Sequence, residues 1–172
     1  MRLSVGARQS TQDIDGIHGA SNGMTSLSRK MAAHHTYCDD VFAQAEAAAE
    51  RGDWPACAQS AKQFRDDVLA HFATEEDAIF PAFEAATGMT EGPTRVMRGE
   101  HVQMRELMTL LVDAAAAADA AGFSDAAETL LILLQQHNMK EENILYPMCD
   151  QTVGSDPAVD AAVDGLIGKV AS

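Results

Sequence analysis

The chain has 172 residues, with 12 Lys and Arg against 26 Asp and Glu and a formal net charge of -14. Its length suffices for one domain with its own hydrophobic core. Its acidity excludes nucleic acid and anionic membrane surfaces as expected partners, because like charges repel. Aromatic residues make up only 5 %, and alanine, the best helix former, is abundant, so the composition favours helices over strands.

The pattern of hydrophobic residues predicts an all-α fold. Residues 1–25 are rich in Gly, Ser, Gln and Asp without a sustained period, which indicates a flexible or loosely docked N-terminal arm. Pro81 is expected to kink or interrupt the second of the helices that follow, and residues 122–125 are expected to separate the third from the fourth. Helical periods predict four helices, over residues 26–51, 54–86, 93–121 and 124–148.

Short connections between these helices favour an antiparallel up-down-up-down four-helix bundle, which we expect over residues 26–150. Residues 151–172 are expected to form a C-terminal tail with a short amphipathic helix near residues 157–170. This helix would either cover the bundle or mediate a homodimer, and the pattern leaves both open.

Three cysteines, an odd number, occur without CxxC spacing: Cys38, Cys57 and Cys149. We therefore expect neither a disulfide framework nor a thiolate zinc site. No apolar run is long enough to span a membrane, and the first residues lack the apolar centre of a secretory signal. The sequence thus predicts a cytoplasmic protein with reduced thiols.

An internal repeat gives the main functional prediction. The segment HFATEEDAIFP, residues 71–81, aligns without gaps with HNMKEENILYP, residues 137–147. The same offset along the chain aligns His35 with His101, so the pattern H-x35-H-x3-E occurs twice and the chain resembles a duplicated helical hairpin. The residues so selected are His35, His71, Glu75, His101, His137 and Glu141.

Helical geometry makes these six residues candidate metal ligands. A His and a Glu at positions i and i+4 lie one turn apart on the same helix face, so both can reach one metal in the bundle core. Two such hairpins would form a dinuclear site in which each ion takes two His, both carboxylates bridge, and room remains for an oxo or hydroxo bridge and an exogenous ligand. Two buried carboxylates would be costly without a cation. Nitrogen and oxygen ligands without thiolate fit iron or manganese, with zinc as a further option.

Several neighbours of these residues have two interpretations each. His34 is adjacent to His35, but the offset of the repeat favours His35 as the ligand. Glu76 and Glu142 either hydrogen-bond to a metal-binding histidine or are solvated helix charges. Cys38 either lines the approach to the site or is a small buried thiol.

Two further expectations concern packing. Tyr146, like Phe80, is expected to pack beside the proline that follows it, although a phenol near two metal ions could take part in redox chemistry. Counted from the expected helix ends, His101 lies several residues deeper in its hairpin than His137.

The motifs resemble the hemerythrin-like, or HHE cation-binding, family. The resemblance covers about residues 27–150 and rests on HTYCDD at His35, GPTRVMRGEH up to His101, and the two repeated segments. It implies an antiparallel four-helix bundle around a non-haem, oxo-bridged di-iron centre. The six residues selected by the repeat would be the ligands, with Glu75 and Glu141 bridging.

One departure from the family pattern bears on function. Oxygen-carrying hemerythrins have HxxxH on the third helix and HxxxxD on the fourth, whereas here Met97 and Arg105 stand at positions i-4 and i+4 relative to His101. The set of four His and two Glu is similar to that of bacterial HHE proteins in nitric-oxide response, iron-centre repair, or iron and oxygen sensing. The repair proteins usually carry an additional N-terminal domain with paired cysteines, and the arm here has no cysteine.

Three functional hypotheses follow. The favoured one is a binding protein rather than a committed enzyme: two iron ions that bind or sense a small diatomic ligand, O2 or NO, with manganese or zinc as less suited occupants. The second is a di-iron oxidoreductase or iron-handling protein of the nitrosative and oxidative stress response, whose redox partner recognises the acidic surface. The third is a metal-free helical docking protein with histidines in its core.

Overall fold

The computed structural model describes residues 26–170, which form helices joined by short connections and contain no strand. The predicted all-α class is confirmed for these residues, whereas the predicted N-terminal arm lies outside them. The first half comprises α1 (Leu27–Glu50), α2 (Trp54–Thr74), the π-helical turn η1 (Glu75–Ile79) and α3 (Phe80–Thr87). The second half comprises α4 (Pro93–Ala116), α5 (Ala120–Lys140), the π-helical turn η2 (Glu141–Leu145) and α6 (Tyr146–Val153), and α7 (Pro157–Val170) follows.

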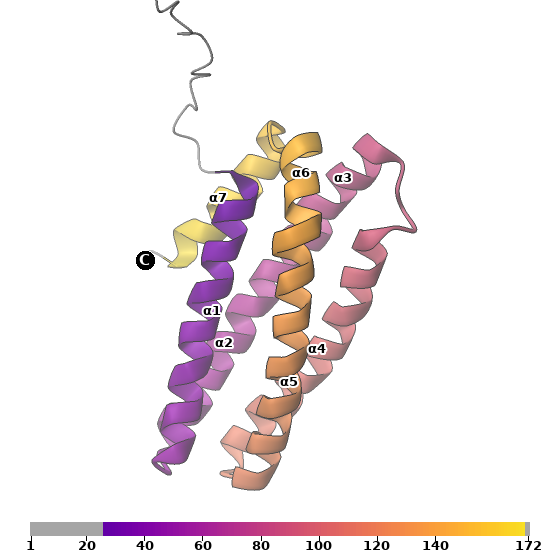
Figure 1. Cartoon of the computed structure of the whole chain (residues 1–172). Coiled ribbons are helices and arrows are strands. Elements are labelled where there is room, and N and C mark those ends of the chain that lie inside the picture. Colours follow the sequence, from indigo (N-terminus) through magenta and orange to yellow (C-terminus); the bar gives the residue numbers. More distant parts are fainter. Residues whose placement is uncertain (1–25, 171–172) are drawn as a thin grey trace, which may run out of the picture.

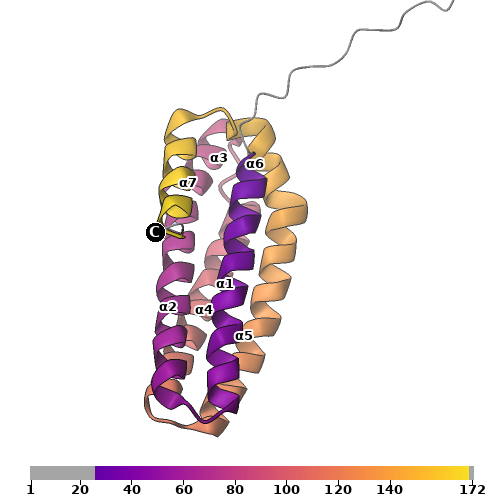
Figure 2. The same ribbon diagram turned by 90° about the vertical axis from the view of Figure 1, so that its left-hand side faces the viewer.

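Every element of the first half recurs in the second half at the offset that aligns Glu75 with Glu141. The duplication inferred from the sequence therefore extends to each helix boundary. Helices α1, α2, α4 and α5 run side by side as long rods, and α3 and α6 extend α2 and α5 at one end (Figures 1 and 2). The most extensive helix contacts join α1 to α2, α4 to α5, and α2 to α4. This packing is compatible with the predicted antiparallel four-helix bundle.

The connection between α4 and α5 differs from the prediction. Helix α4 ends at Ala116 and α5 begins at Ala120, so Gly122 lies in the first turn of α5 instead of breaking the chain. Asp119 caps this helix, because its side chain accepts a hydrogen bond from the amide of Gly122. A Cβ at Gly122 would lie 2.5 Å from Asp119 Oδ2, so the glycine makes room for the cap.

The corrected boundary removes the unequal depth of the histidines. His35 is as far from Glu50, the last residue of α1, as His101 is from Ala116, the last residue of α4. In the same way, His71 and His137 stand at equal distances along the chain from the first residues of their helices, α2 and α5. All four histidines therefore occupy one level of the bundle.

The interruption expected at Pro81 takes the form of a π-helical turn. A proline has no amide hydrogen, and its ring displaces the carbonyl one turn before it. The chain instead closes a wider turn, in which the amide of Phe80 donates to the carbonyl of Glu75. In the second half, before Pro147, the amide of Tyr146 donates to the carbonyl of Glu141 in the same way. Each π-helical turn thus begins at a glutamate of the repeat, and such turns often mark functional sites.

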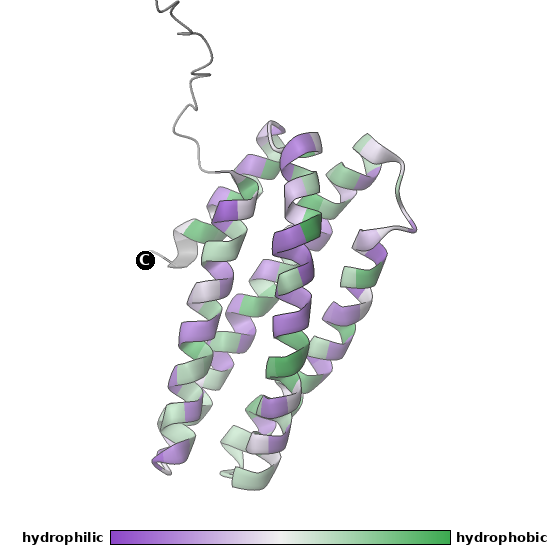
Figure 3. Cartoon of the chain, in the orientation of Figure 1, coloured by the Kyte–Doolittle hydropathy of each residue, from purple (hydrophilic) through white to green (hydrophobic). Residues whose placement is uncertain are grey.

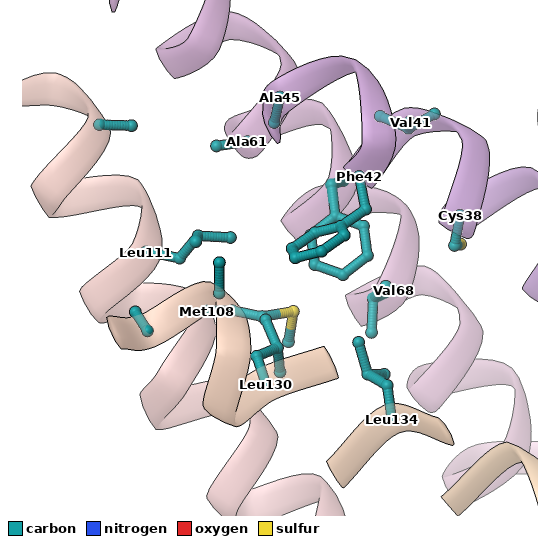
Figure 4. Packing of buried hydrophobic residues seen from close by; sticks show 14 of the residues in the cluster. Cys38, Val41, Phe42, Ala45, Ala61, Val68, Met108, Leu111, Leu130 and Leu134 are labelled. Carbon is teal, nitrogen blue, oxygen red and sulfur yellow. The ribbon is translucent and has the colours of Figure 1, made fainter. Parts of the chain in front are cut away.

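Buried apolar side chains form two clusters on either side of a polar layer. The first cluster lies among α1, α2, α4 and α5, and Figure 4 shows part of it around Phe42. The second cluster includes residues of η1, α3, η2, α6 and α7 as well as residues near the beginning of α1 and α4. On α1, His35 lies between Met31 of the second cluster and Cys38 of the first. The polar residues on the outer faces of the rods appear purple in Figure 3.

Helix α7 packs on the second cluster of its own chain. This agrees with the first of the two predicted alternatives, that this helix covers the bundle. Three of its apolar side chains are buried in that cluster, and Lys30 of α1 forms ion pairs of 2.6 Å with Asp160 and Asp164. The three cysteines are buried and free of disulfides. Across residues 26–170, no helix has the length and apolar character required to cross a membrane.

Candidate metal centre

The six residues selected by the repeat come together in the polar layer. Helices α1, α2, α4 and α5 each contribute one histidine, and the first residue of each π-helical turn contributes a glutamate. All six are buried, and His35, the most exposed of them, has a relative exposure of 6 %. The structure thus brings together residues that lie far apart in the sequence, from His35 to Glu141.

The four histidines form two pairs. The Nε2 atoms of His35 and His71, the first pair, lie 3.0 Å apart. The Nε2 atoms of His101 and His137, the second pair, lie 3.2 Å apart. These separations suit two nitrogen ligands that each lie about 2.1 Å from a common metal ion.

Each glutamate spans both pairs. The Oε1 atom of Glu75 lies 3.7 Å from His71 Nε2, and its Oε2 atom lies 3.3 Å from His101 Nε2. The Oε2 atom of Glu141 lies 3.3 Å from His35 Nε2, and its Oε1 atom lies 3.0 Å from His137 Nε2. This arrangement places one oxygen of each carboxylate beside each pair, as two bridging ligands require.

The two carboxylates also supply a test of whether a metal fits here. Glu75 Oε2 and Glu141 Oε1 are buried atoms without a hydrogen-bond partner. Buried oxygens of this kind are costly, and a cation would satisfy both. The potential ligand atoms form two overlapping groups, each within 4.8 Å: Glu75, His101, His137 and Glu141 in one, and His35, His71 and Glu141 in the other. The donor set therefore fits two ions.

The two buried carboxyl groups differ in their ease of ionisation. Burial, together with the neighbouring Glu141, raises the pKa of Glu75 well above its usual range. Burial also opposes ionisation of Glu141, but the adjacent imidazoles of His137 and His35 hold the pKa of that carboxyl well below its usual range. Without a cation, one of the two carboxyls is therefore protonated and the other ionised.

Two of the histidines are held in the neutral form that binds metals. Burial lowers the pKa of His71 well below its usual value, with a further contribution from the neighbouring His35. Burial, and then His137, lower the pKa of His101 to about 4. Although burial opposes it, hydrogen bonds to Glu141 and Glu142 raise the pKa of His35. A neutral imidazole has a free lone pair, so His71 and His101 are ready to act as ligands at neutral pH.

Three further glutamates hold the outer nitrogens of the histidines. Nδ1 of His35 lies 2.7 Å from Glu142 Oε1, Nδ1 of His101 lies 2.6 Å from Glu76 Oε1, and Nδ1 of His137 lies 2.9 Å from Glu100 Oε2. An Nδ1–H that donates to a carboxylate leaves the Nε2 lone pair facing the centre. For Glu76 and Glu142 this contact supports the hydrogen-bonding alternative over the solvated one.

The second pair is also surrounded by cations. Arg105 donates two hydrogen bonds to Glu76, of 3.1 and 2.9 Å, and Lys140 donates to Glu100. Sequence reasoning missed Glu100, because the repeat aligns this position with His34 and gives no matching residue type. Only its place immediately before His101 could have drawn attention to it.

The adjacent residues His34 and His35 have different surroundings. His35 faces the centre, whereas His34 is buried behind His71, with 3.2 Å between their Nδ1 atoms. The Cys38 Sγ atom lies 3.5 Å from His34 Nδ1. Burial raises the pKa of the Cys38 thiol well above its usual value, which leaves it protonated and unreactive.

Tyr146 lies at the centre, which fits the second of its two predicted roles, a phenol near the metal ions, better than simple packing beside Pro147. Its hydroxyl oxygen lies 2.7 Å from Glu75 Oε1, 2.9 Å from Glu141 Oε2 and 3.0 Å from His71 Nε2. The aligned residue of the first half, Phe80, has no hydroxyl and stacks near His101 at 5.9 Å between ring centroids. Among the four histidines, the phenol oxygen therefore approaches those of the first pair, His71 and, at 3.4 Å, His35.

A small cavity adjoins the first pair. It has a volume of about 20 Å³ and reaches His35 and His71. Cys38 also lines it, as one of its two predicted roles requires. The other walls are the apolar side chains of Phe64, Val68, Phe72 and Leu134, together with the polar Asp39 and Asn138. A cavity of this size holds a single small molecule.

The comparisons with known proteins agree with this geometry. The hemerythrin HHE cation-binding domain matches residues 26–149, a segment that contains all six residues of the centre. No curated protein and no solved structure matches the chain significantly. Because the family match covers well over half of the chain, the chain belongs to the hemerythrin HHE cation-binding family.

Proposed function

We propose that this protein is a cytoplasmic, non-haem di-iron protein that binds or senses a small diatomic ligand, O2 or NO. The observation that carries the proposal is that Glu75 and Glu141 each place one oxygen beside each histidine pair. Four imidazoles and two carboxylates without thiolate suit iron, with manganese or zinc as alternative occupants. Iron in both positions would supply an open coordination position and the electrons that O2 or NO binding requires.

The surroundings of the first pair support a small uncharged ligand. The cavity beside His35 and His71 has room for one small molecule and is lined largely by apolar side chains. Such a lining disfavours anions and larger polar molecules, since their desolvation would be unfavourable.

Metal analysis tests the proposal. Protein isolated under iron-replete conditions should contain about two iron ions per chain. The variants His101→Ala and Glu141→Ala should lower the iron content, whereas His18→Ala, outside the repeat, should not. Stoichiometric zinc that iron does not displace would contradict the assignment to iron. A folded protein that takes up no metal would favour the docking hypothesis instead.

A second candidate function is supported by Tyr146. A phenol in contact with both carboxylates can deliver a proton or an electron to the centre, which would serve a di-iron oxidoreductase or iron-handling protein. Such a protein would need an electron-donor partner, and its net charge of -14 would suit a basic one. Stopped-flow mixing of the reduced protein with O2 or NO separates the two functions. A stable adduct supports binding, and repeated turnover with a reductant supports catalysis.

A further inference from the structure

The internal repeat allows the two histidine pairs to be compared position by position. At the offset of the repeat, His71 corresponds to His137, and His34 corresponds to Glu100. Glu100 Oε2 lies 2.9 Å from His137 Nδ1, and His34 Nδ1 lies 3.2 Å from His71 Nδ1. Glu100 and His34 thus make equivalent contacts with the outer nitrogen of a histidine in their halves, but Glu100 offers a carboxylate and His34 an imidazole.

The contact between His34 and His71 fixes where the proton of His71 lies. For Nε2 of His71 to bind a metal ion, its proton must be on Nδ1. That Nδ1–H then donates to Nδ1 of His34, which must be unprotonated in order to accept it. His71 is 3 % exposed and His34 is 2 % exposed, so bulk water does not replace this acceptor.

We propose that His34 is the positioning residue of His71 and that it makes the two metal positions inequivalent. The proposal rests on the proposed function, because it concerns the ligands of the same centre. A carboxylate acceptor raises the basicity of a metal-binding histidine, and a neutral imidazole acceptor does so less. Of the four histidines, His71 is therefore the weakest electron-pair donor to a metal ion, because it is the one whose Nδ1 faces no carboxylate.

Other positions of the repeat differ in the same way. Arg105 and Lys140, which pair with the carboxylates behind the second pair, align with Asp39 and Thr74 in the first half. Asp39 is close enough to Glu142 for their charges to repel, whereas Arg105 attracts the corresponding Glu76. Several of the differences between the halves therefore lie around the outer nitrogens of the histidines, where they alter donor strength without altering the six ligands.

The test uses the full chain loaded with cobalt(II), whose paramagnetism shifts the proton signals of its ligands. The wild-type protein should show four shifted, slowly exchanging imidazole N–H signals, one for each histidine. Three variants separate the roles of residue 34: His34→Gln keeps a neutral acceptor, His34→Glu provides the carboxylate of the other half, and His34→Leu removes the acceptor. Glu100→Gln is the matched variant of the second half. Cobalt(II) affinity is measured for each ion alongside the spectra.

We expect His34→Leu to lower the affinity for one of the two ions by about 10- to 100-fold and to lose one N–H signal by fast exchange. His34→Gln should keep all four signals, and His34→Glu should raise the affinity for that same ion above the value in His34→Gln. Glu100→Gln should perturb a different N–H signal. Equal affinities in His34→Gln and His34→Glu, or four unchanged signals in His34→Leu, would overturn the inference. A wild-type protein that does not take up two ions would instead contradict the proposed function.

Discussion

Replacing Tyr146 by Phe removes a single hydroxyl from the centre and keeps the ring. The side chain is fully buried, and its oxygen lies 2.7 Å from Glu75 Oε1 and 2.9 Å from Glu141 Oε2. A Phe ring fits this environment, because Phe80 is fully buried at the aligned position of the first half. Loss of a buried hydrogen bond to a charged group lowers the free energy of unfolding by about 2–3 kcal/mol.

The assay is thermal unfolding of the metal-free and the iron-loaded protein. For a chain of this length, about 2–3 kcal/mol corresponds to a decrease in Tm of about 4–12 °C. The decrease should be smaller with iron bound, because the ions then hold the carboxylate oxygens that the phenol has left. Tyr37→Phe is the control, since that side chain is half-buried and lies near Asp67, away from the two carboxylates of the centre, so that water can replace any partner of its hydroxyl at little cost. Equal decreases for both variants, or no decrease for Tyr146→Phe, would refute the reasoning.

Other predictions concern the carboxylates and the α4–α5 connection. Because Glu141 reaches both histidine pairs, Glu141→Gln should lower the content of both iron ions, and loss of one ion only would contradict its bridging role. Because the pKa values of Glu75 and His35 are raised, metal uptake at pH 7 should release about one to two protons, and metal affinity should fall as the pH falls. Calorimetry in buffers of different ionisation enthalpy measures the number of protons released. A release near zero would contradict this prediction. Ala118 has a positive φ of 55° where the first half has Gly52, so Ala118→Gly should raise the free energy of unfolding by about 1 kcal/mol in urea titrations. Gly122→Ala should lower it by about 1 kcal/mol, because the new Cβ would displace the capping Asp119; a stabilised variant would refute this.

The six residues of the centre could be selected from the sequence because the duplication preserved their spacing. A repeat of residue type at a fixed offset, combined with helical periodicity, indicates that the same side chains face the same interior layer in both halves. The structure places these six residues together, although they come from four helices and two π-helical turns. The role of Tyr146 was harder to foresee, because Tyr and Phe are interchangeable in a packing pattern and only the hydroxyl differs.

The other features of the centre and of the fold depend on contacts that the spacing of residues along the chain does not encode. Glu100 and His34 make equivalent contacts at aligned positions, but their side chains differ in type, so a search for identical residues misses both. The boundary between α4 and α5 was misplaced because Gly122 resembles a helix breaker, whereas its role is to admit the side chain of Asp119. The π-helical turns follow from a proline within a helix, but their width becomes visible only in the hydrogen bonds to Glu75 and Glu141.

The most direct test of a dinuclear centre is anomalous diffraction at the iron absorption edge from crystals of the iron-loaded protein. We predict two anomalous peaks, one bound by His35 and His71 and the other by His101 and His137, at about 2.1 Å from each Nε2. Glu75 and Glu141 should each contribute one oxygen to each ion. A single peak, or two peaks with ligands outside this set, would contradict the account.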